Sequence, residues 1–107
     1  MSNTLTILLI LQHESIRISV AKRLELAGKT VIQTANSDEA VAILRTRKVD
    51  LVITEVDIGQ IDGWRLSRLI RTGILASSDA LPILLITENY CERIAETTAR
   101  MFDINRV

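Results

Sequence analysis

The sequence predicts an α/β protein built on a doubly wound parallel sheet. Short apolar segments alternate with helical segments along the 107 residues. These segments are apolar throughout, which is typical of strands buried on both faces of a parallel sheet. Right-handed crossovers then place helices on both faces of that sheet. The length suits a single domain, residues 1–107, with one hydrophobic core.

The first predicted strand, residues 5–11, is the continuous apolar run LTILLIL. A helix is expected over residues 15–28, and Gly28 is placed to end it. Its inner face is predicted to carry the apolar residues at helical spacing, Ile16, Val20, Leu24 and Ala27.

The β-branched stretch over residues 30–35 predicts a second strand. Ser37 is expected to cap a helix over residues 38–46, whose first turn is acidic, as the helix dipole favours. Residues 50–56 read DLVITEV and predict a third strand that is apolar on both faces.

A third helix is expected over residues 63–74, with an inner side formed by Leu66, Leu69 and Ile70. Residues 81–87 predict a fourth strand, which tolerates Pro82 because that residue stands at its start. A fourth helix is expected over residues 90–102. Residues 104–107, INRV, resemble the opening of a fifth strand.

Composition excludes several functional classes. Thirteen basic and thirteen acidic residues cancel, so no net field gathers nucleic acid or anionic lipid. The single cysteine, Cys91, excludes an intrachain disulfide and a cysteine metal cluster. The N-terminus lacks the features of a secretory signal, and no segment approaches the ~18 apolar residues of a membrane span. We therefore expect a cytoplasmic domain with neither nucleic acid nor membrane as its partner.

Polar residues gather where the predicted strands end, which is where doubly wound sheets form their sites. Glu55 ends the third strand in the segment DLVITEVDIGQIDG, and Asp57 and Asp62 follow in the loop. Asp62 is also placed to cap the next helix. Glu14 follows the first strand, and Thr87 ends the fourth. These loops hold no Gly-x-Gly-x-x-Gly or Gly-Lys-Ser/Thr pattern, which disfavours a nucleotide- or flavin-binding domain.

Over essentially its whole length the chain resembles the receiver domain of two-component response regulators. The resemblance is strongest in the segments SDEAVAILRTRKVD, DLVITEVDIGQIDGWRLSRLIR and LPILLIT. It implies a flavodoxin-like, five-stranded parallel sheet in the order 2-1-3-4-5, here truncated at strand five with the last helix missing. Receivers take a phosphoryl group from a histidine kinase onto an aspartate, beside a Mg²⁺ held by an acidic pair after the first strand.

The resemblance assigns the phosphoacceptor position to Glu55, counting back from Asp62 and Gly63 at the start of the third helix. Asp57 falls where the family offers the metal only a backbone carbonyl. Thr87 matches the switch hydroxyl after the fourth strand. The family's lysine position lies just beyond the last residue of the chain.

The family's acidic pair falls on Leu11 and Gln12, or one residue later on Gln12 and His13. Arg17, which follows the pair at a fixed distance in the family, favours Leu11 and Gln12. In either register the pair is lost, and only Glu14 remains nearby.

These departures predict a pseudo-receiver that is not an enzyme. Leu11 offers Mg²⁺ no ligand and Gln12 only a neutral one, so weak or absent Mg²⁺ binding and no other cofactor are expected. Without the metal, the charges on donor and acceptor repel each other. Glu55 is either a tolerated polar residue at a strand end or an imitation of a phosphorylated aspartate that reaches Thr87. The alternative is a working phosphoacceptor that uses Glu55 or Asp57.

The expected function is therefore a phosphorylation-independent protein–protein interaction module. Its partner is predicted to be a histidine kinase, an effector domain or a second copy of the chain. A homodimer is one way to cover the incomplete C-terminal face.

Two features outside the predicted site have alternative interpretations. Trp64 is either an interface anchor or part of the core. Three arginines at helical spacing, Arg65, Arg68 and Arg71, are expected to form a solvated face rather than a nucleic-acid patch.

Overall fold

The computed structural model describes residues 4–76 and 80–86. This part of the chain contains a four-stranded sheet in the order β2-β1-β3-β4, with all neighbouring strands parallel. The strands are β1 Thr6–Ile10, β2 Thr30–Thr34, β3 Leu51–Glu55 and β4 Ile83–Ile86. The order agrees with the prediction for the first four strands. The predicted fourth helix and fifth strand lie outside the described residues.

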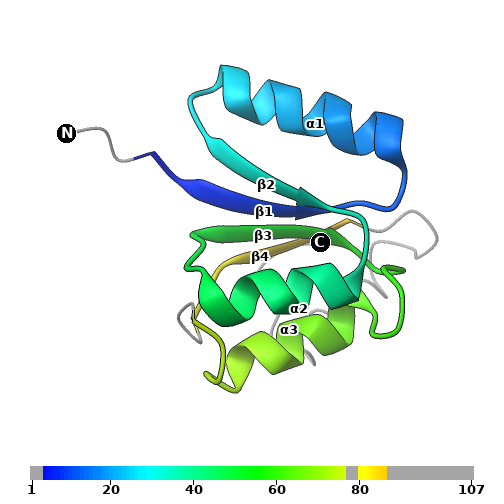
Figure 1. The fold of residues 1–107 in the computed structure, drawn as a ribbon, viewed down its shortest axis with the longest axis vertical. Helices are drawn as coiled ribbons and strands as arrows, with labels where there is room; N and C mark the ends of the chain where they lie inside the picture. Colours follow the sequence, from blue (N-terminus) through cyan, green and yellow to red (C-terminus); the bar gives the residue numbers. More distant parts are fainter. Residues whose placement is uncertain (1–3, 77–79, 87–107) are drawn as a thin grey trace, which may run out of the picture.

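Helices cover both faces of the sheet, as the doubly wound prediction requires. Figure 1 shows α1 on one side of the sheet, with α2 and α3 on the other. The helices span Glu14–Leu26, Ser37–Thr46 and Gly63–Arg71, respectively. Each one connects two parallel strands, so the chain alternates strand and helix throughout residues 6–86.

The core consists of two apolar clusters, one on each face of the sheet. The cluster beneath α2 and α3 includes Leu8 and Ile10 of β1, whereas the cluster beneath α1 includes Ile7 and Leu9. Successive side chains of a strand point to opposite faces. Because both faces are covered, β1 is apolar from Ile7 to Ile10, where every residue is buried.

The inner face of α1 differs from the prediction. Ile16 is 50% exposed and Ala27 is exposed, whereas Ala21 is fully buried. Val20 and Leu24 are half-buried and pack on the cluster beneath α1, as predicted. The helix ends at Leu26, so Ala27 lies beyond its last turn. Ala21 is the residue against the sheet, which leaves Ile16 on the flank of the helix.

The N-cap of α2 is Asn36 rather than Ser37. Asn36 Oδ1 accepts a hydrogen bond of 2.9 Å from the backbone N–H of Glu39. Ser37 is instead the first helical residue and is buried. Its Oγ accepts a hydrogen bond from the N–H of Ile61, while its own N–H donates to the carbonyl of Ile58 at 2.6 Å. Ser37 therefore fastens the loop between β3 and α3 to the start of α2.

Helix α3 is shorter than predicted and strand β4 starts later. The helix ends at Arg71, and Gly73 follows in the left-handed region with φ of 78°. Strand β4 begins at Ile83 rather than at residue 81. The predicted inner side of α3 is confirmed, because Leu66 and Ile70 are buried and Leu69 packs half-buried against the same cluster.

Gly63 allows α3 to begin directly against the end of β3. A Cβ atom there would lie 2.6 Å from the carbonyl oxygen of Glu55 and 2.7 Å from Leu85 Cδ1. The N–H of Gly63 also donates to the carbonyl of Val56 at 2.7 Å. The glycine at this position is therefore required by space rather than by an unusual backbone angle.

Replacing Gly63 with alanine is expected to destabilise the fold by about 2 kcal/mol, because the backbone of β3 must move away from the added methyl group. Urea unfolding followed by circular dichroism measures the change. The control is Arg65→Ala, an exposed position of the same helix, which is expected to stay within about 0.5 kcal/mol of the unaltered chain. Equal stability of the two variants would contradict the steric explanation.

Candidate functional site

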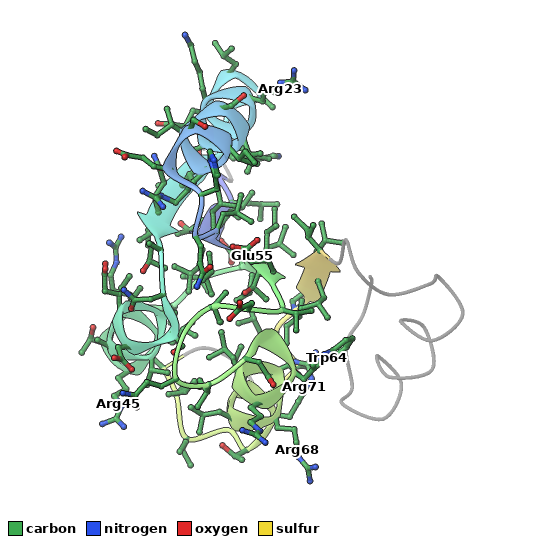
Figure 2. The ribbon with its side chains drawn as sticks, turned by 90° about the vertical axis from the view of Figure 1, so that its right-hand side faces the viewer. Arg23, Arg45, Glu55, Trp64, Arg68 and Arg71 are labelled. Carbon is green, nitrogen blue, oxygen red and sulfur yellow. The ribbon has the colours of Figure 1, made fainter. Side chains whose placement is uncertain are left out.

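The candidate site lies at the carboxyl edge of the sheet. Figure 2 looks onto this edge, with Glu55 at its centre, at the end of β3. Strand β1 lies next to β3 and ends at Ile10, so the residues after β1 lie beside Glu55. Arg23, Arg45 and Arg68 point away from Glu55 toward the periphery of the molecule (Figure 2).

Glu55 is bound to the loop that follows β1. Its Oε1 accepts a hydrogen bond of 2.5 Å from the backbone N–H of Gln12. Glu55 itself is half-buried, and the side chain of Gln12 is exposed. The structure thus brings together two of the residues that the sequence singled out, through the backbone of Gln12 rather than its amide side chain.

Leu11 stands on the apolar side of the same loop. It is 4% exposed and belongs to the cluster beneath α1. Its N–H donates to the carbonyl of Thr34 at 3.2 Å, which ties the loop to β2 as well. A carboxylate at this position would have to leave the apolar cluster, whereas leucine stabilises it.

Arg17 contacts the site in a way that the sequence does not predict. From the first turns of α1, its Nη1 donates a hydrogen bond of 2.8 Å to the carbonyl of Leu11. The sequence indicates only that Arg17 lies at a fixed distance after the first strand, which favours Leu11 and Gln12 as the acidic-pair positions. A basic residue one to two turns into a helix can reach back to the strand end, and this is the available signal for such a contact.

The loop acids have different surroundings. Asp62 Oδ1 accepts a 2.8 Å hydrogen bond from the N–H of Arg65, which confirms it as the N-cap of α3. Asp57 is exposed in the loop after β3, and Glu14 is exposed at the first position of α1. Thr87 lies outside the described residues.

Leu11 and Glu55 offer few free oxygen ligands for Mg²⁺. Mg²⁺ requires oxygen ligands in nearly octahedral geometry. Leu11 supplies no side-chain oxygen, and one carboxylate oxygen of Glu55 is already hydrogen-bonded to Gln12. Within residues 4–76 and 80–86, no three His, Cys, Asp or Glu side chains are grouped so that they could hold a metal ion.

Trp64 is a residue of the core rather than an exposed interface anchor. It is 6% exposed and packs in the cluster beneath α2 and α3. On the same helix, Arg65 and Arg68 are exposed, as expected of a solvated face. Arg71 is partly buried, and its Nη1 donates to the carbonyl of Leu81 at 2.6 Å.

A parallel sheet in the order β2-β1-β3-β4 with helices on both faces (Figure 1) has the arrangement of a flavodoxin-like domain. A profile of the response regulator receiver domain matches residues 7–104, so the chain belongs to this family of signalling modules.

Two curated proteins are similar over most of the chain. The transcriptional regulatory protein AfsQ1 of Streptomyces coelicolor is 32% identical over 82 residues, which are 77% of this chain and 34% of AfsQ1. The probable transcriptional regulator ycf27 of Cyanidium caldarium is 32% identical over 81 residues, 76% of this chain and 30% of that protein. The chain thus spans about a third of the length of these relatives.

Solved receiver structures share the fold. The chemotaxis response regulator CheY4 of Vibrio cholerae superposes with a TM-score of 0.83 at 22% identity, over 97% of this chain and 84% of CheY4. The receiver domain of the sensor histidine kinase PA1611 of Pseudomonas aeruginosa, solved with magnesium in its active-site cleft, gives 0.81 at 20% identity, over 96% and 82%. In the part of our chain that the structure describes, no helix is long and apolar enough to span a membrane.

The different surroundings of the two loop acids lead to a test. Asp62→Ala is expected to destabilise the domain by about 1 kcal/mol, because the N-terminus of α3 loses its cap. Asp57→Ala, in the same loop, is expected to stay within about 0.5 kcal/mol of the unaltered chain. Thermal unfolding of both variants measures the difference, and an Asp57 effect as large as that of Asp62 would contradict this assignment.

Proposed function

We propose that this receiver domain is a pseudo-receiver, which acts as a phosphorylation-independent protein–protein interaction module. The observation that supports it most is the hydrogen bond between Glu55 Oε1 and the N–H of Gln12. The carboxylate at the position that we assign to the phosphoacceptor is thereby directed at the protein's own backbone. The assignment itself rests on the distance from Asp62 and Gly63 at the start of α3.

The chemistry of phosphoryl transfer supports this proposal. Transfer depends almost entirely on positioning and on neutralising charge at the reacting oxygens. Leu11 and Gln12 replace the acidic pair by a buried apolar side chain and a neutral one, so we propose that Mg²⁺ binding is weak or absent. Glu55 also has one more methylene than aspartate, and a displacement of about 1 Å can cost ~100-fold in rate. We accordingly propose that the domain is not an enzyme.

The partners that we propose are proteins. Receiver domains of this family interact with histidine kinases and effector domains. For this chain, a histidine kinase, an effector domain or a second copy of the chain are the candidate classes. The two curated relatives are named as transcriptional regulators, and this chain matches only a third of their length.

The equal numbers of acidic and basic residues support a domain that itself binds no nucleic acid or membrane. We propose a cytoplasmic location, which is typical of response regulators.

Intact mass spectrometry after incubation with acetyl phosphate and Mg²⁺ tests the proposal. The unaltered chain is expected to gain no phosphoryl group, because it lacks the charges that hold the metal. A variant that combines Leu11→Asp, Gln12→Asp and Glu55→Asp is expected to gain one, since it restores the carboxylates of the family.

Two controls make this result interpretable. Circular dichroism establishes that the triple variant is folded, and hydroxylamine removes an acyl phosphate but not a phosphate ester. A hydroxylamine-sensitive adduct on the unaltered chain would contradict the proposal. It would favour the alternative of a working phosphoacceptor, and Glu55→Ala and Asp57→Ala would then show which carboxylate carries the group.

A further inference from the structure

Two charged side chains hold opposite ends of one peptide group at the carboxyl edge of the sheet. The peptide joins Leu11 to Gln12. Its N–H donates to Glu55 Oε1 at 2.5 Å, and its carbonyl accepts from Arg17 Nη1 at 2.8 Å. In a trans peptide the N–H and the C=O point in opposite directions. The anion therefore lies at the positive end of the peptide dipole and the cation at the negative end.

This arrangement strengthens both hydrogen bonds. A hydrogen bond with one ionised partner is stronger than a bond between neutral groups. Hydrogen bonds in a chain also polarise one another, so the bond at one end of the peptide favours the bond at the other end. Arg17 is partly buried and Leu11 is 4% exposed, which limits the competition from water on the arginine side.

The peptide is also a junction between four elements. It follows β1, Glu55 ends β3, and Arg17 belongs to α1. The N–H of Leu11 adds a bond to the carbonyl of Thr34 at the end of β2. One short segment thus fixes how these four elements meet at the edge where the resemblance places the metal and the phosphoryl group.

We infer that Arg17, the Leu11–Gln12 peptide and Glu55 form a metal-independent clasp that holds the loop after β1 to the end of β3. In receivers that have an acidic pair, a cation links the loop after the first strand to the end of the third strand. In this chain the clasp makes the same link through protein groups alone. It keeps this edge in one arrangement whether or not divalent cations are present. The inference deepens the proposed function, because a module without phosphate control needs a site that does not change state.

The clasp predicts that Arg17 and Glu55 act on each other through the peptide. Glu55→Ala removes the acceptor of the Gln12 N–H, so exchange of that amide hydrogen with solvent is expected to accelerate at least about tenfold. Arg17→Met keeps much of the apolar stem but removes the charge at the other end of the peptide. It is expected to accelerate exchange of the same N–H about threefold, although Arg17 donates to the carbonyl.

The measurement is amide hydrogen exchange by NMR on the full chain. The Gln12 rate is divided by the rate of the amide of Leu8, a fully buried residue of β1, so that changes in global unfolding are taken into account. Glu55→Gln retains an acceptor oxygen without the charge and should fall between Glu55→Ala and the unaltered chain. Arg23→Met, at an exposed position of α1, is the matched control and should leave the ratio unchanged.

The double variant Arg17→Met/Glu55→Ala should increase the ratio by less than the product of the two single effects, since both act on one peptide. An unchanged ratio in Glu55→Ala, an unchanged ratio in Arg17→Met or fully multiplicative effects would each overturn the clasp. A phosphoryl adduct on the unaltered chain, with the exchange results as expected, would refute the proposed function and leave the clasp standing.

Discussion

The architecture of the site depends on how the end of β1 is held. In a parallel sheet the backbone leaves each strand at the same edge, and its next peptide groups must find new partners. Here the peptide that joins Leu11 to Gln12 forms hydrogen bonds with Glu55 and Arg17, two charged side chains from different elements. Burial of Leu11 in the cluster beneath α1 adds an apolar anchor to these polar ones.

The start of α3 completes the same edge from the other side of β3. Gly63 lets the helix begin against the carbonyl of Glu55, and Asp62 caps that helix. The start of α3 thus packs closely against the backbone of Glu55, while the side chain of Glu55 reaches the loop after β1. The side chain of Glu55 thus spans the distance from the end of β3 to the loop after β1.

Much of the fold was predictable because the central strands β1 and β3 are covered on both faces and are therefore mostly apolar, with buried residues at 7–10 and 52–54. The pattern was less informative for α1, where Ile16, Ile18 and Leu26 are exposed and only Ala21 is fully buried. Apolar residues on several flanks of a helix do not define an inner face. The cap of α2 was uncertain for another reason, since Asn36 and Ser37 are adjacent and both residue types cap helices well.

The candidate site was predictable in its residue types but not in its contacts. Glu55, Leu11 and Gln12 were identified from their places after two strands and from the resemblance. The bond from the Gln12 N–H to Glu55 depends on the register of β1 and β3 and on a side-chain rotamer, and neither is encoded in a short motif. The contact of Arg17 with Leu11 likewise arises only once α1 is folded back onto the sheet.

Titration with MgCl₂, followed by the amide resonances of Gln12 and Glu55 in ¹H–¹⁵N NMR spectra, tests the central claim most directly. If the carboxylate of Glu55 stays hydrogen-bonded to the N–H of Gln12, neither resonance shifts in a saturable way as Mg²⁺ is added over the millimolar range. Controls with KCl at equal ionic strength separate binding from screening. A saturable shift of the Gln12 amide specific to Mg²⁺ would mean that the cation displaces this hydrogen bond, and it would contradict the account.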